Sequence, residues 1–167
     1  EEPRRADDLA RWAGTAGVQR GGVVGLGLSG DEKAQPVGQF ERAFQMALKK
    51  DLPRAARAGD VQGADGVLKT IAELHPNRIL DGWGTAESPA LVTGLVENNI
   101  TLAVNLTRAV KQGWVGSAAD YPLRKLYDDG VSLALCSDMP SFYQTTLNAE
   151  YVLAVEQCGL STAEVED

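Results

Sequence analysis

The stretch Arg78-Ile-Leu-Asp-Gly-Trp-Gly84 shows the pattern that decides the fold: a short apolar strand ends on a carboxylate and continues into a glycine-rich loop. The same pattern recurs at Ala55-Ala-Arg-Ala-Gly-Asp60 and at Val131-Ser-Leu-Ala-Leu-Cys-Ser-Asp-Met-Pro140. In parallel α/β proteins, functional residues lie where strands end and loops begin. The three strand-end carboxylates therefore mark the edge at which function is expected.

Apolar residues at helical spacing separate these strands. Phe40, Phe44 and Leu48 form an i, i+4, i+8 stripe, which predicts a helix from near Pro36 to Asp51. We expect further helices over residues 4–17, 66–74, 88–98, 123–128 and 147–157, and strands over 22–29, 52–58, 78–81, 100–104 and 131–135. This alternation predicts an α/β fold with a parallel sheet and right-handed crossovers.

The remaining connections are predicted to be loops, over residues 105–120 and 137–145. Near the end of the chain, Ser161 and Glu164 have the spacing of a capping box, which predicts one more short helix.

Composition excludes several classes of protein. With 44% apolar and 23% charged residues, the 167-residue chain is typical of one soluble globular domain. The formal charge of −7 and the absence of basic runs argue against nucleic-acid and anionic-membrane binders. No apolar run approaches the roughly 18 residues of a membrane span, so no membrane association is expected.

Cys136 and Cys158 are too few for a disulfide framework or a zinc knuckle. Cys136 is expected in a buried strand. The first residues lack the apolar core of a signal peptide. Together these features predict a reduced, cytoplasmic setting.

Six motifs carry a resemblance to a known family: Gly25-Leu-Gly-Leu-Ser-Gly-Asp-Glu32, Arg57-Ala-Gly-Asp60, Arg78-Ile-Leu-Asp-Gly82, Ser137-Asp-Met-Pro140, Thr145-Thr-Leu-Asn-Ala-Glu-Tyr151 and Gly159-Leu-Ser161. In order and spacing they resemble the adenosine deaminase family. The resemblance implies a single partial barrel over residues 1–167. It consists of strands four to eight of a (β/α)8 TIM barrel, with the other strands supplied by another chain, another segment or a homo-oligomer.

The resemblance also implies roles for the strand-end residues. The family's histidine-alanine-glycine-glutamate motif supplies a zinc ligand and the acid that protonates the purine, and these two positions are here Arg57 and Asp60. The family's hydroxide-orienting histidine is here Asp81. Asp138 matches a zinc-ligand aspartate, whereas Met139 replaces the neighbouring aspartate that contacts substrate.

A catalytic zinc site needs about three protein ligands and a water, and an arginine cannot ligate zinc. Of the matched positions only Asp138 keeps a ligand, and the single histidine, His75, is expected in a turn before Pro76. The sequence therefore predicts no metal site and no cofactor, zinc included.

The first functional hypothesis is a repurposed, metal-independent enzyme of small-molecule biosynthesis. Asp60, Asp81, Asp138 and Arg57 are its expected catalytic residues. Crowded carboxylates separate one another's pKa values, which lets one act as acid and another as base. Such a site suits elimination, isomerisation or cyclisation. Alternatively, each aspartate only caps the helix that follows it.

Four residues are the expected substrate-binding set. Gly30 matches the glycine whose backbone contacts the purine, and Trp83 and Met139 are expected to form an apolar wall. Arg108, in the predicted loop after residue 104, is expected either to contact an anionic group or to be solvated.

Two other readings remain open. In the first, the chain is a non-catalytic subunit that completes a partner barrel. In the second, it is part of a purine nucleoside deaminase whose metal ligands come from a missing segment.

Overall fold

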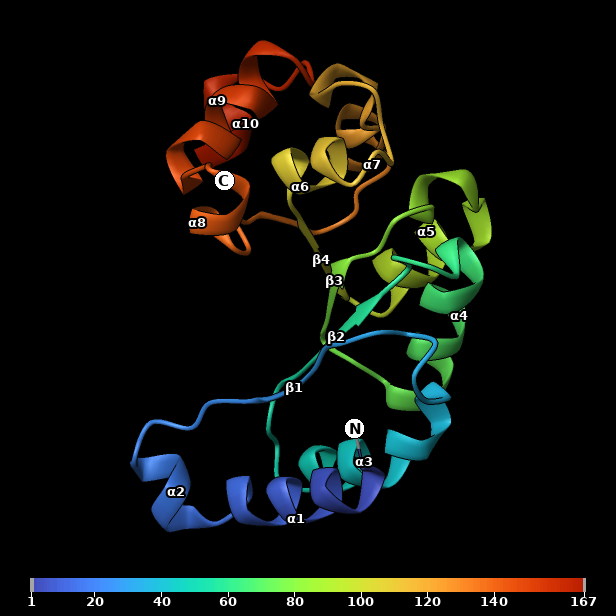
Figure 1. The fold of residues 1–167 in the computed structure, drawn as a ribbon, viewed down its shortest axis with the longest axis vertical. Helices are drawn as coiled ribbons and strands as arrows, with labels where there is room; N and C mark the ends of the chain where they lie inside the picture. Colours follow the sequence, from blue (N-terminus) through green and yellow to red (C-terminus); the bar gives the residue numbers. More distant parts are fainter. Residues whose placement is uncertain (1, 167) are drawn as a thin grey trace. The chain divides into compact units, whose positions relative to one another are not determined.

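The computed structural model describes residues 2–166 and shows the expected alternation of strands and helices (Figure 1). The strands are β1 (Leu26–Leu28), β2 (Arg54–Ala58), β3 (Arg78–Asp81), β4 (Thr101–Val104) and β5 (Leu133–Leu135). The helices are α1 (Pro3–Ala13), α2 (Ala16–Arg20), α3 (Glu41–Leu48), α4 (Gly63–Leu74), α5 (Pro89–Glu97), α6 (Leu106–Lys111), α7 (Leu123–Asp128), α8 (Pro140–Tyr143), α9 (Leu147–Glu156) and α10 (Thr162–Glu166), with 3-10 turns η1 (Val37–Phe40), η2 (Thr85–Glu87) and η3 (Ala118–Asp120). The chain divides into two compact units between Glu87 and Ser88.

In the first unit, β1, β2 and β3 pair in parallel in chain order. Side chains alternate along β2: Ala56 and Ala58 are fully buried, whereas Ala55 and Arg57 point to the opposite face. The register places Arg57 beside Leu80, one residue before the end of β3. This pairing brings the carboxyl ends of the two strands together.

The core of the first unit lies between the strands and helices α1 and α3, which run side by side in Figure 1. Phe40 and Phe44, two members of the predicted stripe, are buried there with Leu26 of β1. The predicted helix is confirmed, although its first turn is the 3-10 turn η1.

In the second unit, β4 and β5 pair in parallel, with Leu102 beside Leu133 and Val104 beside Leu135. Ser161 and Glu164 form the predicted capping contacts at α10. Cys136 was expected in a buried strand, but it follows β5 and is half-buried. None of the helices within residues 2–166 is long and apolar enough to cross a membrane.

The two predicted loops of the second unit are wrong, because each contains a helix. Helix α6 begins immediately after Asn105, whose Oδ1 accepts the Arg108 backbone N–H at 2.7 Å. The carboxylate of Glu150 on α9 is fully buried and accepts the backbone N–H groups of Leu106 and Thr107 at 2.8 and 3.1 Å. A contact 44 residues away in sequence thus caps this helix, and local periodicity does not show it.

Candidate active site

The Arg57–Asp81 ion pair is the most buried charge pair at the predicted functional edge. Arg57 Nη1 donates to Asp81 Oδ2 at 2.5 Å, and only 15% and 5% of the two side chains are exposed. Burial strengthens the attraction between the two charges and also adds a desolvation cost for each of them, so removing either partner would leave an uncompensated buried charge.

The backbone at Asp81 is left-handed, with φ 68°, and Gly82 follows with φ 55°. Aspartate enters this region more readily than most residues, although it remains strained there. Because of this conformation, the alternation of side chains along β3 ends at Asp81. The Asp81 carboxylate contacts Arg57 of β2. The sequence pattern of aspartate followed by glycine after a strand thus has a geometric reason.

Asp60 lies in the turn that follows β2, which we call the Asp60 turn (residues 59–62). Glu32, from the loop after β1, accepts hydrogen bonds from the backbone N–H groups of Gly59, Val61 and Gln62. Sequence reasoning missed this role, although Gly30-Asp-Glu32 directly after a strand was a signal for it.

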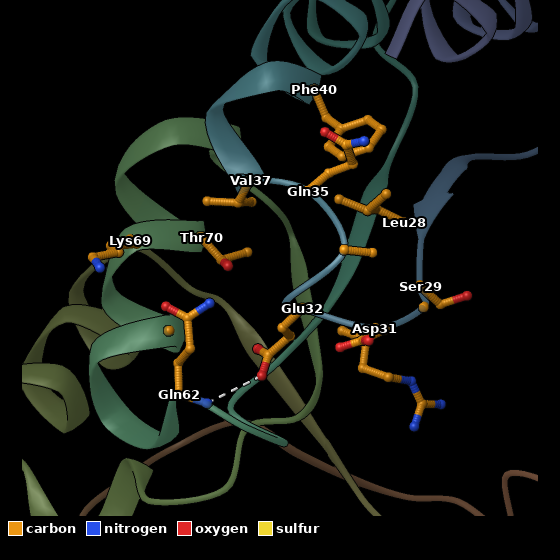
Figure 2. A pocket seen from close by; sticks show the side chains of 14 residues that line it. Leu28, Ser29, Asp31, Glu32, Gln35, Val37, Phe40, Gln62, Lys69 and Thr70 are labelled. Atoms are coloured by element: carbon orange, nitrogen blue, oxygen red, sulfur yellow. Dashed lines mark hydrogen bonds between the residues drawn. The ribbon is translucent and has the colours of Figure 1, made fainter. Parts of the chain in front are cut away.

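A cavity of about 190 Å³ lies beside the ends of β1 and β2. Figure 2 shows Leu28, Val37 and Phe40 on its apolar side and Glu32 and Gln62 at its polar side. One water occupies roughly 30 Å³ in the liquid, so the cavity has room for an organic group. Of the predicted site residues, Arg57 and Gly30 line it.

Trp83 lies between Asp81 and η2 and supports the Asp60 turn from the other side. A Cβ placed on Gly59, whose φ is +93°, would lie 2.7 Å from the Trp83 carbonyl oxygen and 2.8 Å from its nitrogen. Only glycine allows this approach of the two backbones. The turns after β2 and β3 are therefore packed directly on each other.

In the second unit, Asp138 follows β5 with a left-handed backbone, φ 48°, and pairs with Arg108. Arg108 Nε lies 3.6 Å from Asp138 Oδ2 and donates to the Tyr143 hydroxyl at 3.2 Å, and its guanidinium carbon lies 4.9 Å from the centre of the Trp114 ring. The prediction of a loop arginine is wrong, because Arg108 is a buried residue of α6.

Met139 immediately precedes α8 and is 49% exposed. Phe142 on the same short helix is also exposed and meets the Tyr143 ring edge to face, with centroids 5.0 Å apart. Tyr143 was missed in the sequence because the segment was predicted to be a loop.

Comparison with known proteins extends over the whole chain. The adenosine deaminase family model matches residues 1–167. The chain is 34% identical to an adenine deaminase of Rhizobium leguminosarum over 98% of its own length and 50% of the relative's. An adenosine deaminase of Serratia proteamaculans is 34% identical over 89% of this chain and 45% of the relative.

Solved structures show the same fold. The N6-methyl-AMP deaminase of Arabidopsis thaliana matches with a TM-score of 0.86 and 27% identity, over 99% of this chain and 48% of that one. The α/β class and the partial-barrel prediction are confirmed, since the structural neighbours are amidohydrolase TIM barrels. The chain spans about half the length of the relatives that it matches.

The prediction that no cofactor is involved is contradicted by these comparisons. Members of the matched family are zinc-dependent deaminases, and an amidohydrolase of Burkholderia ambifaria with the same fold was solved with bound Zn. Within residues 2–166, however, no group of three or more His, Cys, Asp or Glu side chains is placed to hold a metal ion. The described residues alone therefore do not fit a zinc site.

The motifs, the strand ends and the comparisons all point to one family. Asp60 follows β2, Asp81 ends β3 and Asp138 follows β5, and the family model covers the full sequence. This chain belongs to the adenosine deaminase family.

Proposed function

We propose that the protein containing this chain is an enzyme that removes an amino group from a purine base, nucleoside or nucleotide. The relatives named above act on adenine, adenosine and N6-methyl-AMP, which share an amino-substituted purine. The observation that carries the proposal to this chain is the buried Arg57–Asp81 pair at the carboxyl ends of β2 and β3.

In this proposal the carboxyl ends of the strands bind and orient the purine. The Asp81 carboxylate, paired with Arg57, accepts a hydrogen bond from a ring or amino N–H of the ligand. Asp60 supplies a further carboxylate, and Gly30 and Trp83 contact the ring. No metal ligand is assigned within this chain, and none of these roles passes through a metal.

A second candidate is favoured by one specific observation. Arg57 and Asp81 form a buried ion pair, and the resemblance implies that the family has histidines at these two positions. A carboxylate in this place suits proton transfer to and from a carbon acid. Elimination, isomerisation or cyclisation of a small biosynthetic substrate would use the same residues. Isomerisation, cyclisation and the elimination of water release no ammonia, which separates them experimentally from deamination.

The test uses the full-length protein, with its metal content measured before assay. Adenine, adenosine, AMP and N6-methyl-AMP are supplied, and the release of ammonia or methylamine is followed together with the product mass. We expect turnover of at least one substrate, and Asp81→Asn is expected to lower kcat/KM by about 100-fold or more.

Asp129→Asn is the matched control, because Asp129 lies at the surface and pairs with Lys125 on α7. Its kcat/KM should equal that of the wild-type protein. Unchanged turnover in Asp81→Asn would contradict the assigned role of this residue. A wild-type protein that turns over none of the four purines would contradict the proposed reaction.

A further inference from the structure

Glu32 joins two loops that are about 30 residues apart in sequence. Its Oε1 accepts the Gly59 N–H at 2.5 Å, and its Oε2 accepts the Val61 and Gln62 N–H groups at 2.7 and 3.2 Å. Figure 2 shows this side chain extending from the loop after β1 toward Gln62. Both carboxylate oxygens are engaged with the Asp60 turn.

The three amides lie on both sides of Asp60, so the carboxylate of Glu32 holds the backbone of that residue from each flank. Hydrogen bonds to an ionised acceptor are about twice as strong as neutral ones. Gly66 on α4 leaves room for this contact, because a Cβ there would lie 3.3 Å from Glu32 Oε1. The Trp83 backbone supports the same turn from the other side.

We propose that Glu32 is a positioning residue that sets the orientation of the Asp60 carboxylate; the proposal rests on the proposed function for its catalytic consequence. Glu32 also lines the cavity, together with Gly30 and Arg57. The loop that borders the cavity and the turn that carries Asp60 are therefore joined through the Glu32 carboxylate.

The simpler role for Glu32 is to cap α4. Gln62 is the N-cap residue of this helix and its side chain makes no capping hydrogen bond, so a carboxylate from elsewhere satisfies the first amides. A pure cap changes the free energy of unfolding and leaves the chemical step unchanged. Positioning changes kcat and its pH dependence as well.

The experiment compares Glu32→Ala, Glu32→Gln and Thr146→Ala in the full-length protein, with adenine and adenosine as probes. Thr146 is the matched control, since its Oγ1 caps α9 by accepting the Ala149 N–H at 3.1 Å. We expect Glu32→Ala to lower kcat by about 100-fold with a smaller change in KM, as a displacement of about 1 Å does. The pH dependence of kcat should shift with it.

Glu32→Gln keeps one acceptor oxygen but sets an NH2 donor against the remaining backbone N–H groups, so it should recover only part of the lost kcat. Thr146→Ala should lose stability and keep kcat. Equal kcat in Glu32→Ala and wild type would reduce Glu32 to a helix cap and overturn the proposal. If Glu32→Ala does not fold, Glu32→Gln decides the question. A lowered kcat together with a shifted pH profile of kcat supports positioning by Glu32. An unshifted pH profile contradicts positioning.

Amide hydrogen exchange separates this proposal from the proposed function. Loss of Glu32 should increase exchange at Gly59, Val61 and Gln62, whether or not a purine is turned over. If no purine is turned over, the proposed function fails. Increased exchange at these amides would still show that Glu32 fixes the backbone of the Asp60 turn. Unchanged exchange in a folded Glu32→Ala protein overturns it.

Discussion

The two units each place an arginine against an aspartate at a strand end, yet the two pairs are built differently. Arg57 and Asp81 meet at 2.5 Å, with both side chains at least 85% buried. Arg108 and Asp138 are 3.6 Å apart, and Asp138 keeps 21% of its side chain exposed. The second arginine also donates to the Tyr143 hydroxyl and lies over the Trp114 ring.

The difference between the two ion pairs shows that an arginine and an aspartate at a strand end need not contribute equally to stability in both units. The attraction between two charges grows as they approach and as water is excluded, and the cost of removing one partner of the pair grows with it. In the first pair the aspartate is the critical partner, whereas in the second pair the arginine organises several neighbours. Single substitutions can separate these two cases.

The largest effect is expected for Asp81→Ala. It removes the carboxylate that compensates a mostly buried guanidinium, and it places alanine at a left-handed position, so the free energy of unfolding should fall by about 3 kcal/mol. Asp138→Ala also places alanine at a left-handed position, but its ion pair is longer and partly solvated, so it should cost only about 1.5 kcal/mol. Urea unfolding of both variants measures the difference, and equal losses would erase the distinction between the pairs.

A smaller effect is expected for Arg108→Lys, at about 2 kcal/mol. Lysine cannot reproduce the planar guanidinium that meets the Tyr143 hydroxyl, the Trp114 ring and Asp138 together. The loss should exceed that of Asp138→Ala, because more contacts depend on the arginine. A variant as stable as wild type in urea would show that the arginine does not organise this unit.

The smallest effect is expected at the exposed cluster of Arg124 and Glu164. Hydrogen bonds from the Ser161 backbone and from Arg124 lower the pKa of Glu164 from 4.5 to about 2. A carboxyl with a lowered folded pKa stabilises the fold above its unfolded pKa, and this contribution is lost as the pH falls toward the folded value.

Glu164→Gln should therefore be less stable than wild type at pH 6, and the gap should narrow between pH 4.5 and pH 2. Urea midpoints at pH 6 and pH 3 measure this, with Asp129→Asn as the control. Because salt screens exposed charges, the gap should also shrink in 1 M NaCl. A gap that is independent of pH and salt would mean that Glu164 acts by packing.

The order of strands and helices was predictable because hydrophobic period is a local property. The stripe of Phe40 and Phe44 and the strand at residues 78–81 needed no distant contact to be recognised. Helix α6 was not predictable in this way, because Glu150 and the burial of Arg108 stabilise it from segments far away in sequence. The same holds for the candidate site: its strand-end carboxylates were predictable from the sequence, and their partners were not.

The sequence by itself determined the α/β alternation, the carboxylates at the strand ends and the membership of the adenosine deaminase family. Only the tertiary structure decided which charges meet: Arg57 with Asp81, Arg108 with Asp138, and Glu32 with the amides around Asp60. The physical reason is that periodicity acts over a few residues, whereas ion pairs and hydrogen bonds act over a few ångströms. Strand register and helix packing set those distances.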